Sequence, residues 1–480
     1  MNFISKKPVP FWLITIAVLT GLCLPVLIQD GMFMDALLYT SVSHNLSQGI
    51  GTFWFPQFSY HNVAAMASFH EQPPLVFGIQ SLFFSVFGSS MYVERFYTLV
   101  TLIVTAILIV LLWKEIFREN EIVKKYGWLP VLLWITIPVC FWSYSNNIHE
   151  NTMGIFTFLS VYFVLRAYSR GKNTLLLIIL AGISVFLATF SKGIPGLFPV
   201  TVPFLYWLFI RKHGFLKAVF HSAIIVFIPA IIYGILILFP EPRESLSLHF
   251  IERALQRINE VPTVDYRAYI LVRLLMELAG QIVFVLIFLF IFRFRKSETK
   301  GNVQWNYALF FISAGIAGSL PLMLTMVQKG FYFVPSLPFF AIGLSIIAIP
   351  ALSELIERIN VRKTYYSILL ISGIVLMTLA LSLTVFNAGK ASRDREMIHD
   401  VHLIGKVVPA KSIVSIPYEI WNEWSLQCYL IRHYNISMDM NSDMEFYLID
   451  KSMPFKKDSI YGKLDIGLEK YDLYRLRDQQ

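Results

Sequence analysis

Long apolar stretches recur along most of the chain. Eleven of them approach the length of about 20 helical residues that crosses the hydrocarbon core of a bilayer. Because only helices and closed barrels satisfy their backbone hydrogen bonds inside lipid, we expect residues 1–388 to form an all-α polytopic membrane domain. The predicted spans are residues 10–28, 95–113, 128–145, 151–168, 174–190, 195–211, 216–239, 270–292, 305–326, 332–350 and 365–387.

The composition excludes several other classes of protein. Of the 480 residues, 56% are hydrophobic and only 15% are charged, whereas about a quarter of a soluble domain is charged. The formal net charge is +9, but the basic residues fall mostly in short loops between predicted spans, which is typical of membrane topology and not of a nucleic-acid surface. The three cysteines are scattered and offer neither a disulfide framework nor a CxxC metal site.

Lysine and arginine are divided unevenly between the two sets of loops. One set carries clusters of basic residues, whereas the short loops of the other set carry only Lys192 and Lys329. Because cytoplasmic loops retain Lys and Arg, this asymmetry places the N-terminus in the cytoplasm and the C-terminal residues outside. We expect an integral protein of the plasma membrane, as in the inner membrane of a bacterium.

Two long loops, residues 29–94 and 240–269, are therefore predicted to face outward. Within the first loop, residues 74–88 are apolar but too short to span, so they predict a helix lying along the membrane surface. Residues 245–260 have apolar side chains at near-helical spacing and predict a second interfacial helix. Residues 389–480 are more polar and mix strand-like and helix-like runs, which indicates a small extracytoplasmic α/β domain.

Acids and cations from separate segments are predicted to meet at the outer face. Carboxylates just past the end of a span are costly beside hydrocarbon unless they have a function. A general base near several cations suits transfer of a group from an anionic, lipid-borne leaving group. The residues are Asp30, Asp35, His70, Glu71, His149, Glu150, Lys192, Arg253, Arg257, Lys329 and Tyr332.

Four motifs in this order resemble those of one family of membrane enzymes. They are DALLYTSVSHNLSQG at residues 35–49, HEQPPL at 70–75, FSKGIPG at 190–196 and KGFYFVPSLP at 329–338. The chain resembles lipid-phosphate-dependent glycosyltransferases of the GT-C fold, the group that contains protein O-mannosyltransferases and bacterial aminoarabinose transferases. The resemblance covers nearly the whole chain and implies a GT-C-like catalytic domain whose main motif lies in loop 29–94.

The resemblance implies that Asp35 is the catalytic carboxylate, acting as a general base on the acceptor hydroxyl, with Tyr39 in support. An alternative role for Asp35 is the N-cap of a helix over residues 36–46, a common role for Asp. Asp30 either caps the end of the first span or supports Asp35, and the sequence leaves both roles open.

Glu71 matches the family acid ahead of the proline pair, and the resemblance implies a catalytic role for it. With His70 it offers two ligands for a divalent metal, which do not complete a site on their own; the alternative for His70 is a loop hydrogen bond.

Gln72 departs from the family, whose members usually carry Lys or His there. Glu150 occupies the position of a second family acid, and its alternative is stabilisation of a helix N-terminus by its charge.

Four residues are assigned to the donor phosphate: Lys192, Lys329, Tyr332 and Arg257. Lys192 lies in a short outer turn beside a glycine, although most lysines lie in the cytoplasmic loops. The alternative is a lysine whose aliphatic stem lies along apolar surface while its ammonium reaches water. Arg253 and Arg257, four residues apart, are candidates for phosphate or lipid head groups. A solvated helix face is the alternative for both arginines.

The sequence therefore predicts a mannosyltransferase-like glycosyltransferase of the cell envelope. The resemblance implies that it moves a sugar from a polyprenyl-phosphate donor to a lipid, glycan or protein acceptor on the extracytoplasmic face, by an inverting displacement with Asp35 as base. The chain has no Gly-rich phosphate loop, so no nucleotide is expected, and the distribution of basic residues gives no reason to expect a nucleic acid. A divalent metal at His70 and Glu71 is the one cofactor considered. The alternative is a multispan transporter or lipid flippase. Such proteins usually show repeated halves and ionisable residues near the bilayer midplane, and this sequence shows neither.

Overall fold

The computed structural model divides into two compact units. The first, the helical unit, comprises Met1–Val26, Thr98–Ser145 and His149–Asn387, and the second, the mixed unit, comprises Leu27–Tyr97, Asn146–Ile148 and Ala388–Gln480. The predicted domain boundary after residue 388 stays a prediction. The structure describes residues 6–61, 68–253, 262–294, 303–361, 363–441, 443–457 and 459–477.

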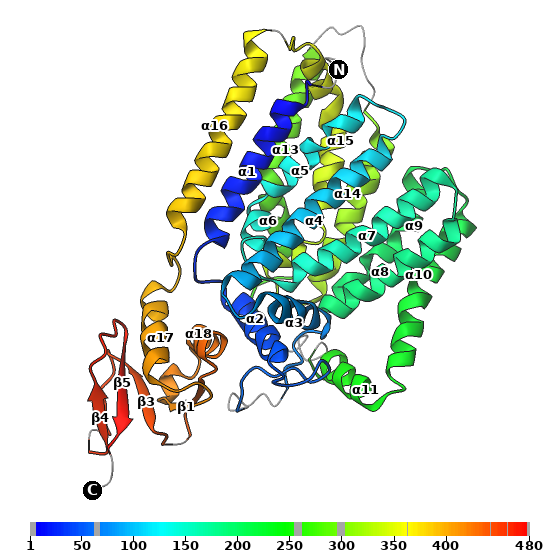
Figure 1. The fold of residues 1–480 in the computed structure, drawn as a ribbon. Coiled ribbons are helices and arrows are strands. Elements are labelled where there is room, and N and C mark those ends of the chain that lie inside the picture. The colour runs from blue at the N-terminus through cyan, green and yellow to red at the C-terminus, as the bar shows by residue number, and fades with distance from the viewer. Residues whose placement is uncertain are drawn as a thin grey trace. The chain divides into compact units, whose positions relative to one another are not determined.

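Nine helices in the described residues are long and apolar enough to cross a membrane, which confirms the predicted polytopic all-α fold (Figure 1). The chain is an integral membrane protein. The nine helices are α1 (Val9–Leu27), α4 (Tyr92–Ile116), α7 (His149–Arg170), α8 (Thr174–Lys192), α10 (Phe215–Leu236), α13 (Tyr269–Phe294), α14 (Trp305–Ser319, continued by η5, Leu320–Leu324), α15 (Leu337–Glu357) and α16 (Thr364–Asn387).

The other two predicted spans fold as pairs of short helices. Residues 128–145 form α5 (Trp128–Ile135) and α6 (Pro138–Ser143), and residues 195–211 form η3 (Ile194–Thr201) and α9 (Val202–Phe209). Proline explains the first break, because Pro138 lacks an N–H and holds the preceding Ile137 in an extended conformation. The total of eleven spans stays a prediction.

Close helix packing in the helical unit depends on glycine. A Cβ at Gly182 of α8 would lie 2.8 Å from the Cβ of Ile228 on α10, and one at Gly315 of α14 would lie 2.6 Å from the ring of Phe340 on α15. Small residues of this kind let membrane helices approach closely. Other faces of the unit remain apolar and exposed, as at Leu216 on α10 and Val385 on α16, which suits contact with lipid.

The helices predicted in the two outer loops are present within the described residues. In the first loop, α2 (Met34–Ser47) and α3 (Leu75–Phe87) lie side by side (Figure 1), and α3 coincides with the predicted interfacial helix. In the second, α11 (Pro240–Ser247) continues into a π-helix, η4 (Leu248–Arg253). The remainder of that predicted helix, including Arg257, lies outside the described residues.

The C-terminal part of the mixed unit is the predicted small α/β structure. Its sheet has the order β2-β1-β3-β5-β4, with β1 parallel to β2 and β3, and β5 antiparallel to β3 and β4. The buried carboxylate of Asp400 accepts N–H bonds from Glu469, Lys470 and Tyr471, which fixes the start of β5 against α17. The elements are α17 (Arg395–Val407), β1 (Ile413–Ser415), η7 (Tyr418–Ile420), α18 (Trp424–Tyr434), β2 (Ser437–Asp439), β3 (Phe446–Asp450), β4 (Tyr461–Leu464) and β5 (Tyr471–Leu476).

Candidate functional site

Asp35 lies in the first turn of α2, and its side chain is half-buried. The helix begins at Met34 and its N-cap position is Phe33, so Asp35 does not serve as the cap. Burial, and then the charge of Asp35 nearby, raise the pKa of the Cys428 thiol on α18 well above its usual range. The carboxylate therefore lies near an uncharged thiol, and the alternative role as a cap does not explain its position.

The second part of the loop motif packs against α2 one turn beyond Asp35. The side-chain amide of Gln72 donates to the hydroxyl of Tyr39 at 3.1 Å, and both residues are buried. The rings of Phe69 and Phe77 meet the Tyr39 ring edge to face, with centroids 6.4 and 6.1 Å away. Gln72, the residue that departs from the family pattern, thus has a packing role on Tyr39.

His70 and Glu71 flank this contact. His70 is buried, with its ring edge-on to Phe55, and Glu71 is half-buried. Among the described residues, no group of three or more His, Cys, Asp or Glu side chains is arranged to hold a metal ion. The two predicted ligands therefore gain no third ligand within that part of the chain, and we derive no step through a metal.

Asp30 is buried at the start of the loop, beyond the end of α1. One carboxylate oxygen accepts the N–H of Gly31 at 2.7 Å, and the other lies 3.4 Å from Nε2 of His402 on α17. Burial opposes ionisation, but the bond to His402 and the nearby charges of His433 and Arg95 outweigh it and lower the pKa of Asp30 to about 2. The contacts hold the residues ahead of α2, and both alternative roles of Asp30, capping the first span or supporting Asp35, stay predictions.

His433 on α18 makes the stability of the region around Asp30 depend on pH. Burial, then the charge of Arg432, lower its pKa from 6.5 to about 4, although Asp30 acts in the opposite direction. The neighbours that also face it are Tyr429, which stacks on its ring, and His402 and Arg95. The unfolded chain therefore binds a proton at this histidine before the folded chain does, so protonation favours unfolding between these two pH values.

We expect the mixed unit to lose stability as the pH falls from about 6.5 to about 4, by roughly 3 kcal/mol from His433 alone. Thermal melting of the purified protein across this pH range measures the effect. His433→Gln should weaken the pH dependence, and the remainder comes from buried His44, whose pKa burial lowers to about 3. His399→Gln, at an exposed side chain, should preserve the full dependence. An unchanged slope in His433→Gln would contradict the assignment.

Glu150 and Lys192 meet inside the helical unit. Glu150 lies in the first turn of α7 and Lys192 in the last turn of α8, and Lys192 Nζ lies 3.1 Å from Glu150 Oε1 with both side chains buried. His149 is buried beside Lys192. Two residues predicted for separate roles therefore form one buried ion pair.

The turn after Lys192 requires glycine. Gly193 has φ +84°, and a Cβ there would lie 3.2 Å from Nε2 of His249 in the π-helix η4. Sequence analysis did not identify His249. It lies in a π-helical turn, and such turns are frequent at functional sites. The FSKGIPG motif thus brings Lys192 and the second outer loop together.

Lys329 lies on a polar cavity of about 370 Å³, formed where residues 263–273 meet residues 328–330. Its side chain is exposed, and in the described part of the chain no carboxylate lies within ion-pair distance of its ammonium. Arg273, which sequence analysis missed because it falls inside a predicted span, also lines the cavity and pairs with Glu277 at 2.8 Å. Tyr332 is half-buried one turn along, and its N–H donates to the Lys329 carbonyl.

An open, apolar cavity of about 560 Å³ lies beside the Gly193 turn. Its wall comes from α8, η3, α10, α11 and η4, with Tyr233 and Phe250 among the apolar lining and Arg243 as the cation. A lipid chain has the chemistry that suits such a wall.

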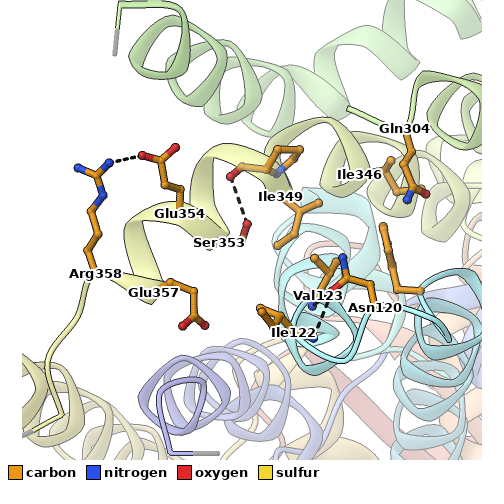
Figure 2. Close-up of a pocket in the computed structure, with 12 residues that line it drawn as sticks. Asn120, Ile122, Val123, Gln304, Ile346, Ile349, Ser353, Glu354, Glu357 and Arg358 are labelled. Atoms are coloured by element: carbon orange, nitrogen blue, oxygen red, sulfur yellow. Dashed lines mark hydrogen bonds and ion pairs between the residues drawn. The ribbon is translucent and has the colours of Figure 1, made fainter. Parts of the chain in front are cut away.

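The cavity in Figure 2, of about 440 Å³, lies at the C-terminal end of α15, whereas Lys329 precedes the N-terminal end of that helix. Glu354 pairs with Arg358 there, and Glu357 pairs with Lys7 and accepts the Tyr126 hydroxyl. Because these carboxylates are already satisfied, this cavity offers no catalytic set.

Residues 71–237 match the sequence family described as dolichyl-phosphate-mannose-protein mannosyltransferase. No match was found among curated protein sequences. The fold is similar to ArnT from Cupriavidus metallidurans bound to undecaprenyl phosphate, with TM-score 0.67, 11% identity and 98% of each chain covered. Its apo state gives TM-score 0.62, 12% identity and the same coverage.

The Archaeoglobus fulgidus oligosaccharyltransferase complex with Zn and sulfate gives TM-score 0.50 and 14% identity, over 91% of this chain and 68% of that one. The family match includes Glu71, Glu150 and Lys192, and the shared fold extends over nearly the whole chain. Together, these comparisons show a membrane protein of the GT-C fold in which residues 71–237 are similar to a glycosyltransferase family.

Proposed function

We propose that the protein transfers a sugar from a polyprenyl-phosphate donor to a hydroxyl acceptor on the extracytoplasmic face, with inversion at the anomeric carbon. The observation that carries the proposal is the position of Asp35. It is a half-buried carboxylate in the first turn of α2, it does not cap the helix, and the family motif at residues 70–75 packs one turn away. A carboxylate held in this way suits a general base.

The proposed step balances without a cofactor. Asp35 takes the proton of the acceptor hydroxyl while the hydroxyl oxygen bonds to the anomeric carbon from the face opposite the phosphate. The bond from that carbon to the phosphate oxygen breaks, and its electron pair leaves with the lipid phosphate. A cation near the phosphate stabilises the charge that develops there.

Lys329 is proposed as this cation, since it is exposed on a polar cavity and no carboxylate of the described chain pairs with it. Lys192 is proposed as a second phosphate ligand, although it is already held by Glu150. Tyr332 and Arg257 remain proposals for the same role. Glu71 and Glu150 are proposed to order the site and not to replace Asp35 as base.

The donor's lipid chain is proposed to lie in the apolar cavity beside the Gly193 turn, with Arg243 toward its charged end. The undecaprenyl phosphate bound to the similar ArnT structure supports a lipid of this kind. The family description of the matched residues supports a lipid-phosphate sugar as donor. Topology supports the extracytoplasmic face, because the short loops with the fewest basic residues contain Lys192 and Lys329.

The test is sugar transfer by the purified protein in liposomes that contain a radiolabelled polyprenyl-phosphate sugar and a panel of lipid, glycan and peptide acceptors. We expect labelled product in at least one acceptor class and release of polyprenyl phosphate, with and without EDTA. Movement of labelled lipid across the bilayer with no transfer would instead identify a flippase. Loss of transfer in EDTA would add a metal to the site.

We expect Lys329→Met to raise the KM for the donor about tenfold or more while kcat changes less, because one charge-assisted contact to phosphate is lost. The matched control is Lys217→Met, at an exposed lysine that begins α10. Equal KM values for the two variants would remove Lys329 from the proposed phosphate site.

A further inference from the structure

Residues 30–33 form a short connection between α1 and α2, and its backbone is held at every residue. The partners lie far away in sequence, and all belong to the mixed unit. The bonds run from Asp30 N–H to the Lys390 carbonyl (2.9 Å), from Arg95 Nη2 to the Gly31 carbonyl (3.0 Å), from Met32 N–H to the Tyr429 hydroxyl (3.3 Å) and from Phe33 N–H to Asn146 Oδ1 (3.0 Å).

The C-terminal segment also shapes this connection sterically. Gly31 has φ +85°, and a Cβ there would lie 2.7 Å from the carbonyl oxygen of Arg393. The Arg393 guanidinium lies over the Phe33 ring, 5.7 Å from its centroid. Only glycine fits this approach, so the chain path into α2 is set by residues that come after the last predicted span.

Tyr429 on α18 makes the most specific of these contacts. Its fully buried hydroxyl accepts the N–H of Met32 and donates to Oδ2 of Asp394 at 3.2 Å. Burial, and then the charge of Asp394, raise the pKa of Tyr429 well above its usual range, so the hydroxyl keeps the proton that it donates. One side chain thus links the segment ahead of Asp35 to the start of α17.

Helix α18 is itself fixed against the first loop at two further points. Ser41 Oγ on α2 shares its proton between the carbonyls of Leu37 (2.9 Å) and Cys428 (3.2 Å). Arg432 forms a buried ion pair with Glu94 at 2.8 Å and also donates to the carbonyls of Ser89 and Ser90. The helix is therefore a rigid support for the helix that carries Asp35.

We propose that the C-terminal segment positions the general base, with Tyr429 acting through Met32 as a positioning residue for Asp35. This inference rests on the proposed function of Asp35. Met32 precedes Asp35 by less than one helical turn, so a change in the path of residues 30–33 moves the carboxylate. A misplacement of about 1 Å costs up to about a hundredfold in rate, which makes such a support necessary.

The experiment compares Tyr429→Phe with Tyr418→Phe, a matched change at an exposed tyrosine of the same segment. We expect Tyr429→Phe to lower kcat by about tenfold or more, with the donor KM unchanged. The number of polyprenyl-phosphate binding sites per protein molecule should also stay at the wild-type value. A merely structural fault would reduce that number in step with kcat.

The same change is then made in the Asp35→Asn background. If Tyr429 acts through Asp35, Tyr429→Phe causes no further loss of the residual turnover of Asp35→Asn. The effects of substituting two residues that act together are not additive. Asp394→Asn, which removes a charge from the other partner of the hydroxyl, is a second variant and should reproduce the loss of kcat if Tyr429→Phe fails to fold.

Two results overturn the inference: wild-type kcat in both Tyr429→Phe and Asp394→Asn, or a full further loss when Tyr429→Phe is added to Asp35→Asn. Neither result affects the proposed function, which fails on a different outcome, namely normal turnover by Asp35→Asn alone.

Discussion

We expect Asp35→Asn to reduce sugar transfer to a small residual turnover while the protein keeps its fold and its affinity for polyprenyl phosphate. The amide has nearly the size of the carboxylate but cannot accept the acceptor proton, so a loss of at least about a hundredfold in kcat is expected. Because Asp35 does not cap α2, the helix should not lose a capping bond with this change. Radiolabelled transfer at saturating donor measures the loss, and binding of polyprenyl phosphate measures the retained site.

The matched control is Asp465→Asn, the same chemical change at an exposed position of the mixed unit, where full activity is expected. Asp35→Glu tests geometry, since it keeps the carboxylate but lengthens the side chain. It should retain more activity than Asp35→Asn. Transfer by Asp35→Asn at the wild-type rate would remove the general base from the mechanism.

Much of the fold is predictable because its causes are local. Apolar length marks a span, and the polar composition after residue 388 marks the small α/β structure, which the sheet of five strands confirms. The spans at 128–145 and 195–211 are the exceptions. Pro138 divides the first, the second contains Pro195, Pro199 and Pro203, and a hydropathy pattern does not register a lost backbone N–H.

The site is less predictable because its contacts join distant parts of the chain. The motif at residues 35–49 indicates Asp35 and Tyr39, but Met32 and Tyr429 are 397 positions apart and neither belongs to a motif. Likewise, Glu150 and Lys192 read as separate acid and cation until the antiparallel pairing of α7 and α8 brings them to 3.1 Å. Sequence pattern shows which residue types are present, whereas tertiary packing decides which of them neutralise each other.

The buried pair of Glu150 and Lys192 gives the second large effect. Lys192→Met should destabilise the helical unit by about 3–5 kcal/mol, because it leaves the Glu150 carboxylate buried without its counter-charge. The control is Arg358→Met, which breaks the more exposed pair with Glu354 and should cost about 1 kcal/mol or less. Thermal melting in detergent compares the two. Equal melting temperatures for these variants would mean that Glu150 is not held as a buried charge.

The double variant Lys192→Met/Glu150→Gln separates the structural role of the pair from phosphate binding. It removes both charges, so the uncompensated carboxylate disappears and most of the lost stability should return. Phosphate binding by Lys192 does not return with it, and we expect the donor KM to stay about tenfold or more above the wild-type value although the protein is stable. Recovery of both stability and donor KM would instead show that Lys192 serves only to neutralise Glu150, and that phosphate binding rests on Lys329 and its cavity. A stable protein with a raised KM is the result that the proposed mechanism requires, because in that mechanism the lysine exchanges a fixed carboxylate for the phosphate of the departing lipid.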